Sequence, residues 1–155
     1  GYEGRILVLD CDVHQGNGTA RILTGSPRVF TASLHGERNY PFHKPPSDLD
    51  VGLPDGTGDR DYRQALENAL NRIAAVFKPD LVFYLAGIDP LAEDRFGRLS
   101  LTTAGLEERD RIVLRWCSDQ GAAVAILLSG GYAPTLAETV DAHVLAFKAA
   151  REILT

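Results

Sequence analysis

The residues best suited to chemistry lie near the start of the chain, in the stretch DCDVHQGNG at positions 10–18. Asp10, Asp12 and His14 occupy every second position, so they would share one face of an extended strand. Two carboxylates and an imidazole together are costly to bury unless a cation neutralises them. Histidine and carboxylate ligands suit zinc, and three protein ligands leave a coordination position open. The stretch therefore predicts one wall of a metal site, although Asp10 could instead cap a turn.

A further ligand is expected at the carboxyl end of another strand, where ligands bind in open parallel sheets. Asp89 ends the apolar run 81–89 and is the candidate, although alone it could be a helix N-cap. Other polar or small residues that end apolar runs are Ser33, His35, Gly130, Gly131 and Tyr132. If the strands are parallel neighbours, all of these groups meet at one crevice. The alternative for Tyr132 is that it merely packs after a tight turn.

Alternating strand and helix patterns indicate the elements that would position these groups. Four continuous apolar runs are typical of parallel strands covered on both faces, and they span 5–10, 28–35, 81–89 and 123–132. Helical spacing predicts helices over 61–77, 102–121 and 134–154. The expected helix-end residues are Asp59 and Thr102 as N-caps, Gly121 as a C-terminal stop and Pro134 in a first turn. Strands that alternate with helices predict an α/β fold with a mainly parallel sheet.

The segment 36–58 is rich in proline and glycine and is predicted to be a long ordered loop. A loop of this length in a small domain often lines a pocket, but it could also be a surface excursion. The remaining histidines, His35, His43 and His143, are interpreted as structural or solvated rather than catalytic.

Bulk composition narrows the class of protein. A chain of 155 residues with 45% hydrophobic and 24% charged residues is typical of one globular domain. The net charge of -5 argues against a nucleic-acid partner. No apolar run has membrane-spanning length and no signal peptide is evident, so no membrane partner is expected. Cys11 and Cys117 are too few for a disulfide framework and indicate a cytoplasmic setting.

Together, these motifs resemble the zinc-dependent histone deacetylase family, above all its class IV branch and bacterial relatives. The series D-x-D-x-H-Q-G-N-G, S-L-H, A-G-I-D-P-L-A-E-D-R-F-G-R-L-S-L-T and S-G-G-Y follows the family's order. It runs from about residue 5 to the last predicted helix. The resemblance implies an arginase/deacetylase-like, three-layer αβα fold with helices on both faces of the sheet. It also implies zinc-dependent hydrolysis of the amide of acetyl-lysine, acyl-lysine or a related acylated amine.

The resemblance further implies roles for individual residues. The implied zinc ligands are Asp12, His14 and Asp89, and the implied potassium site is Asp10, Ser33 and the backbone of Leu34. Tyr132 would stabilise the oxyanion that forms when metal-activated water attacks the substrate. The residues implied to border the acyl channel are Gly130 and Gly131, with a looser match at Tyr40 and Phe42.

One part of the family pattern is absent from this sequence. The family's general base and acid belong to a tandem His-His pair upstream of the D-x-D-x-H strand, whereas the four histidines here stand at 14, 35, 43 and 143. We therefore expect residues 1–155 to form a single domain, the C-terminal portion of a longer deacetylase domain. That portion would carry the metal ligands but need not be active by itself.

Two other functions fit part of the pattern. A ureohydrolase would share the α/β plan, but its two manganese ions need additional aspartates where Gly16 and Leu91 stand. A non-catalytic module that binds zinc or an acyl group would agree with the absent His-His pair. The sequence does not choose among histone tails, other acetylated proteins, acetylpolyamines and longer acyl-lysines as substrates, and it does not specify an oligomeric state.

Overall fold

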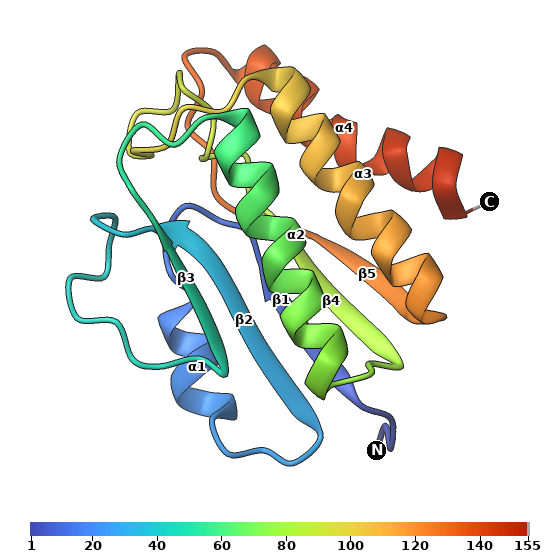
Figure 1. The fold of residues 1–155 in the computed structure, drawn as a ribbon. Coiled ribbons are helices and arrows are strands. Elements are labelled where there is room, and N and C mark those ends of the chain that lie inside the picture. The colour runs from blue at the N-terminus through green and yellow to red at the C-terminus, as the bar shows by residue number, and fades with distance from the viewer. Residues whose placement is uncertain (155) are drawn as a thin grey trace.

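Five parallel strands form a single sheet in the order β3-β2-β1-β4-β5 in the computed structural model, which describes residues 1–154 (Figure 1). The strands are β1 (Ile6–Asp10), β2 (Val29–Gly36), β3 (Leu49–Leu53), β4 (Leu81–Ala86) and β5 (Ala123–Leu128). The helices are α1 (Asn17–Leu23), α2 (Asp59–Val76), α3 (Thr103–Gln120) and α4 (Leu136–Leu154). None of the helices among these residues is long and apolar enough to cross a membrane.

The helices cover both faces of the sheet, as predicted. From β1 the chain moves outward through α1 to β2, and it later returns through α2 and α3 to β4 and β5. Connections between parallel strands are right-handed, so the direction in which the chain crosses the sheet decides which face its helix covers. The chain crosses in one direction through α1 and in the other through α2 and α3, so α1 lies on one face and α2 and α3 lie on the other (Figure 1). α4 packs on α3 and reaches the edge strand β5. The expected α/β fold is therefore confirmed.

The central strand β1 links the core to the candidate site. Leu7, Leu9, Cys11 and Val13 are fully buried in the main apolar core. Because side chains alternate along a strand, Asp10 lies on the opposite face, and its paired residue on the neighbouring strand β2 is Ser33. The edge strand β5 is more open than β1, and Leu127 and Leu128 at its end are 40% and 61% exposed.

Two elements lie outside the predicted set. The short helix α1 follows the glycine-rich stretch directly, and β3 lies inside the segment 36–58, so the prediction of a loop is wrong for Leu49–Leu53. As an edge strand, β3 buries its two end leucines while the residues between them are partly or fully exposed. Its five residues therefore lack the continuous apolar run that marks a buried parallel strand.

The predicted helix ends are partly confirmed. Thr102 caps α3 by accepting a hydrogen bond from Gly105 N (3.0 Å), and Gly121 ends α3 in the left-handed conformation with φ 67°. Asp59 is not an N-cap, because Gly58 holds that position before α2. The Asp59 carboxylate instead accepts hydrogen bonds from the N–H and hydroxyl of Thr102 (2.8 and 2.7 Å) and so joins the starts of two helices. Pro134 precedes α4 rather than lying in its first turn.

Candidate metal centre

Three of the predicted site residues meet where the neighbouring strands β1 and β4 end. Asp12 and His14 lie on the loop after β1, and Asp89 lies on the loop after β4. One potential ligand atom from each side chain lies within 4.8 Å of the other two. Asp12 and Asp89 are buried, and the His14 side chain is 33% exposed, so the cluster opens to solvent on the histidine side.

Each carboxylate in the cluster has one oxygen directed at His14. His14 Nδ1 lies 3.0 Å from Asp12 Oδ1 and 3.1 Å from Asp89 Oδ2. The other Asp89 oxygen accepts a hydrogen bond from Val13 N (2.8 Å). The other Asp12 oxygen accepts hydrogen bonds from Ser129 Oγ and Gly130 N (2.7 Å each). These outer contacts fix the orientation of both carboxylates, as hydrogen bonds to the ligands do in metal sites.

The loop after β1 is shaped by its own aspartates. Asp10 Oδ1 accepts a hydrogen bond from Asp12 N (3.0 Å), and Asp12 Oδ1 accepts one from His14 N (2.9 Å). These are successive Asx turns, in which an aspartate bonds to the backbone two residues ahead. The strand ends at Asp10. The expectation that Asp10, Asp12 and His14 share one face of an extended strand is therefore wrong, although Asp12 and His14 still converge.

Burial and mutual contact shift the protonation of the cluster. Burial raises the pKa of Asp10 to about 7 and that of Asp89 to about 6. Burial also acts to raise the pKa of Asp12, but hydrogen bonds with His14, Asp89 and Ser129 outweigh it and hold this pKa below its usual range. Hydrogen bonds to Asp12 and Asp89 raise the pKa of His14 to about 10. A protonated imidazole thus offsets one of the two negative charges of Asp12 and Asp89, and a divalent cation would offset both.

Metal binding at this cluster is expected to strengthen as pH rises. A metal ion binds only the unprotonated imidazole, whereas His14 with a pKa of about 10 carries a proton at neutral pH. Displacing one proton makes the affinity rise about tenfold per pH unit between pH 7 and 9. Below pH 6 the slope becomes steeper, because Asp89 with a pKa of about 6 must also lose its proton. Competition titrations with a chromophoric chelator would measure this, and a pH-independent affinity would contradict it.

The residues predicted for potassium lie beside this cluster rather than in it. Asp10 and Ser33 occupy paired positions on β1 and β2, and both are buried. Leu34 follows Ser33 and is fully buried. Ser33 Oγ lies 3.0 Å from His35 Nδ1, which gives His35 a hydrogen-bonding partner within the sheet. The structure thus brings Asp10 and Ser33 together, and the potassium role stays a prediction.

The S-G-G-Y segment after β5 supplies the remaining predicted residues. Gly130 binds Asp12 through its N–H, and its carbonyl accepts a hydrogen bond from Ile88 N (2.8 Å). Tyr132 is 59% exposed and packs edge-on against Phe96, with ring centroids 5.0 Å apart. Asp94 Oδ2 accepts a hydrogen bond from Tyr132 N (2.6 Å). The loop after β4 therefore supports both the backbone and the ring of Tyr132.

Sequence reasoning missed the supporting residues Ser129, Asp94 and Phe96. Ser129 stands inside the S-G-G-Y motif, so its place beside Gly130 was a usable signal. Asp94 and Phe96 fall within the motif after Asp89, but the sequence does not indicate that this loop folds against Tyr132.

Gly130 leaves no room for a side chain, and Gly130→Ala is expected to weaken zinc binding at least tenfold. A Cβ at this position would lie against Asp89 Oδ2 and 2.6 Å from Asp12 Oδ2, so a methyl group would push the two carboxylates apart. Displacing groups that orient metal ligands typically costs about 10- to 100-fold in affinity. The matched control is Gly18→Ala, where no atom lies within 4 Å of the added carbon. Equal zinc affinity in the two variants would refute the expected crowding.

Comparisons with known proteins show which family this chain resembles. The histone deacetylase domain model matches residues 1–147. An uncharacterised protein of Picosynechococcus sp. is 47% identical over 153 residues, which cover 99% of this chain and 51% of that protein. Histone deacetylase 2 of Arabidopsis thaliana is 32% identical over 139 residues, which cover 88% of this chain and 36% of that protein. The crystal structure of a histone deacetylase homologue from Aquifex aeolicus matches with a TM-score of 0.74 and 27% identity, covering 97% of this chain and 46% of that one. The chain thus spans about half or less of the length of these relatives.

Proposed function

This chain belongs to the histone deacetylase family, and on that premise we propose that it carries the zinc-binding part of an amide hydrolase. The substrate would be an acetylated or acylated lysine or a related acylated amine. The observation that carries the proposal is the convergence of Asp12, His14 and Asp89 within 4.8 Å at the ends of two adjacent strands. We take residues 1–155 as one domain that corresponds to the C-terminal portion of the family's domain.

Asp12, His14 and Asp89 would hold the zinc ion. When bound, zinc would polarise the substrate carbonyl and lower the pKa of a bound water. The carboxylates are oriented for this by their hydrogen bonds to Val13, Ser129 and Gly130. A single ion fits better than a manganese pair, because Gly16 and Leu91 stand where the second ion's ligands would be. Asp10, Ser33 and the Leu34 carbonyl would hold potassium beside the zinc.

Other residues of this chain would act directly on the substrate. The Tyr132 hydroxyl would donate a hydrogen bond to the acyl oxygen as negative charge develops there. Gly130 and Gly131, which have no side chains, would leave space for the acyl-lysine chain. The leaving amine needs a proton, and the 155 residues contain no tandem histidine pair to supply it. Proton transfer is therefore not assigned to any residue of this chain.

The setting proposed for this activity follows from composition and burial. The net charge of -5 favours cationic substrates such as lysine-rich peptides or acetylpolyamines over nucleic acid or anionic membranes. Cys11 and Cys117 are both free and buried, which suits the cytoplasm.

The proposal is tested by metal content and hydrolysis on the purified chain. After chelator treatment and reloading with zinc and manganese together, elemental analysis should find one zinc per chain. Two manganese ions per chain would favour the ureohydrolase alternative. One zinc together with hydrolysis of acetyl-lysine peptides or acetylpolyamines would exclude the non-catalytic module, for which the missing His-His pair is the specific observation.

Tyr132→Phe is expected to lower kcat for an acetyl-lysine peptide about 100- to 1,000-fold, the usual loss when one oxyanion donor is removed. Zinc affinity should stay the same, because Tyr132 contacts the loop at Asp94 through its backbone N–H rather than through its hydroxyl. Tyr2→Phe is the matched control, since Tyr2 is similarly exposed at 54% but lies before β1, at the opposite end of that strand from Asp12 and His14. Equal turnover in the two variants would remove Tyr132 from the mechanism.

A further inference from the structure

We propose that Arg109 is a positioning residue for the metal centre. From α3 it would hold the loops after β1 and β4 at the separation at which their ligands meet. This inference rests on the proposed function, and it deepens that function by naming a residue that touches neither metal nor substrate.

Arg109 bonds to the backbone of both ligand-bearing loops. Its Nη1 donates hydrogen bonds to the carbonyl oxygens of Gly87 (2.5 Å) and Cys11 (3.4 Å). Cys11 directly precedes the ligand Asp12, and Gly87 stands two residues before the ligand Asp89. A single guanidinium nitrogen thus bridges the two segments just beyond the strand ends.

The rest of the guanidinium is fixed by a buried acid. Arg109 Nε and Nη2 donate to Asp110 Oδ1 (3.0 and 2.8 Å), and the Tyr84 hydroxyl of β4 donates to the same oxygen (2.5 Å). Arg109 and Asp110 are 1% exposed, and Tyr84 is fully buried. The planar fork of arginine therefore has two nitrogens engaged by Asp110 and the third directed at the loops.

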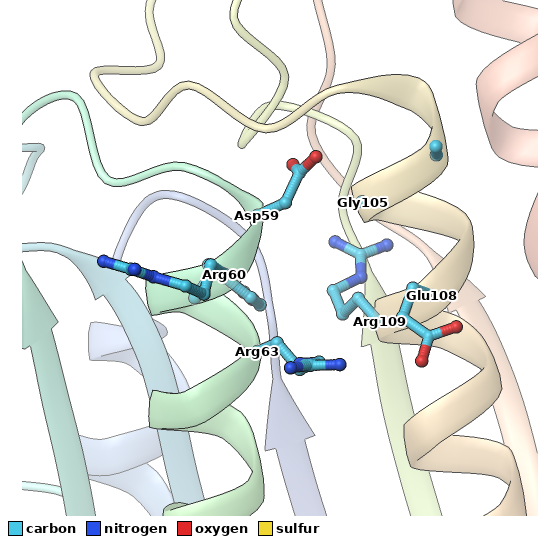
Figure 2. Close-up of a pocket in the computed structure, with 8 residues that line it drawn as sticks. Asp59, Arg60, Arg63, Gly105, Glu108 and Arg109 are labelled. Atoms are coloured by element: carbon cyan, nitrogen blue, oxygen red, sulfur yellow. The ribbon is translucent and has the colours of Figure 1, made fainter.

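The surroundings of Arg109 agree with an inward-facing role. A pocket of about 330 Å³ lies between the first turns of α2 and α3, and Arg109 is one of the residues that line it. Figure 2 shows the Arg109 guanidinium in the space between these helices, whereas the carboxylate of its neighbour Glu108 is turned away from it. Full burial of an arginine is rare unless it is paired, and the ion pair with Asp110 meets that requirement. The remaining nitrogen, Nη1, is satisfied by the loop carbonyls of Gly87 and Cys11.

The two loops are close enough that a small shift in one would move the other. A Cβ added to Gly87 would lie 2.8 Å from Asp12 Cα, so the backbones of the two ligand-bearing segments are nearly in contact there. Val13 N also bonds across to the Asp89 carboxylate. Arg109 ties the same two segments from the α3 side, and its loss would let the ligand loops separate.

The first test compares zinc affinity in Arg109→Lys and Arg109→Met with Val113→Ala. Val113 is fully buried one turn further along α3, so its truncation destabilises the same helix without removing a hydrogen bond to the loops. Both Arg109 variants should bind zinc at least tenfold more weakly, within the range of about 10- to 100-fold for supporting groups. Lysine keeps the charge beside Asp110 but cannot supply the three nitrogens of the fork. The visible spectrum of the cobalt-substituted protein should change in the Arg109 variants and not in Val113→Ala.

The second test needs no metal. In the metal-free protein, the Val13 and His14 amides should exchange hydrogen at least tenfold faster in Arg109→Met than in Val113→Ala. If Arg109→Met does not fold, Arg109→Lys serves for both tests. Zinc affinity and exchange rates like those of Val113→Ala would overturn the positioning role while leaving the metal centre intact. Failure of the unmodified protein to bind zinc would overturn the proposed function, and the exchange rates would still decide the role of Arg109.

Discussion

Asp89→Ala is expected to weaken zinc binding about 100- to 1,000-fold. Zinc held by four protein ligands contributes about 10–16 kcal/mol, or roughly 2.5–4 kcal/mol for each ligand, which corresponds to this loss. Asp89 also accepts the Val13 N–H and faces His14 Nδ1, so its removal frees the loop that carries the other two proposed ligands. Isothermal titration with zinc would measure the loss.

Two further variants separate the roles of Asp89. Asp89→Asn keeps an oxygen for the Val13 N–H but removes the negative charge. Compared with Asp89→Ala, it should hold the loop after β1 in place but should recover little of the zinc affinity. Asp80→Ala is the matched control, because Asp80 bonds to Arg5 N away from the ligand cluster. Zinc binding by Asp89→Ala as tight as by Asp80→Ala would exclude Asp89 as a ligand.

Asp110→Ala is expected to lower the free energy of unfolding by about 3–5 kcal/mol, the usual effect of leaving a buried charge without its partner. The change would leave Arg109 buried with no carboxylate and would deprive the Tyr84 hydroxyl of its acceptor. Domains of this size have a total stability of only about 5–15 kcal/mol, so the variant would be near the limit of folding. Urea unfolding followed by circular dichroism would measure the change, and a loss below about 1 kcal/mol would contradict it.

The double variant Arg109→Met/Asp110→Leu should recover the part of that stability that is lost to the unpaired charge, because apolar side chains can replace a buried ion pair at little cost. The Tyr84 hydroxyl still lacks its acceptor in this variant, so recovery should be incomplete. The double variant should not recover zinc affinity, since the hydrogen bonds to Cys11 O and Gly87 O remain absent. Stability and metal binding would then respond differently to the same pair of residues.

Sequence patterns predicted the strands that matter most for the site. Continuous apolar runs identified β1, β2, β4 and β5, and the rule that ligands lie beyond strand ends identified Asp89 beside Asp12 and His14. The sequence did not predict β3, because a short edge strand has no such run. It did not predict α1, because the seven residues of this helix begin within a glycine-rich stretch.

The local path of the metal loop could not be predicted from periodicity. Alternation assumes an extended backbone, whereas the carboxylates of Asp10 and Asp12 bond to the amides ahead of them and turn the chain. The burial of Arg109 and Asp110 could not be predicted from the sequence either. They lie in the run E-E-R-D-R, which indicates a solvated helix face, and only the position of α3 over the strand ends shows their burial.

The openness of β5 bears on how this chain behaves in concentrated solution. An outermost strand presents free backbone donors and acceptors to which another chain can add edge to edge. The sequence of β5, AVAILL, has no charge and no proline, and Leu127 and Leu128 at its end are exposed. Short uncharged segments of this kind promote aggregation. The strand that leads into the S-G-G-Y segment is therefore also a segment through which copies of this polypeptide are expected to aggregate.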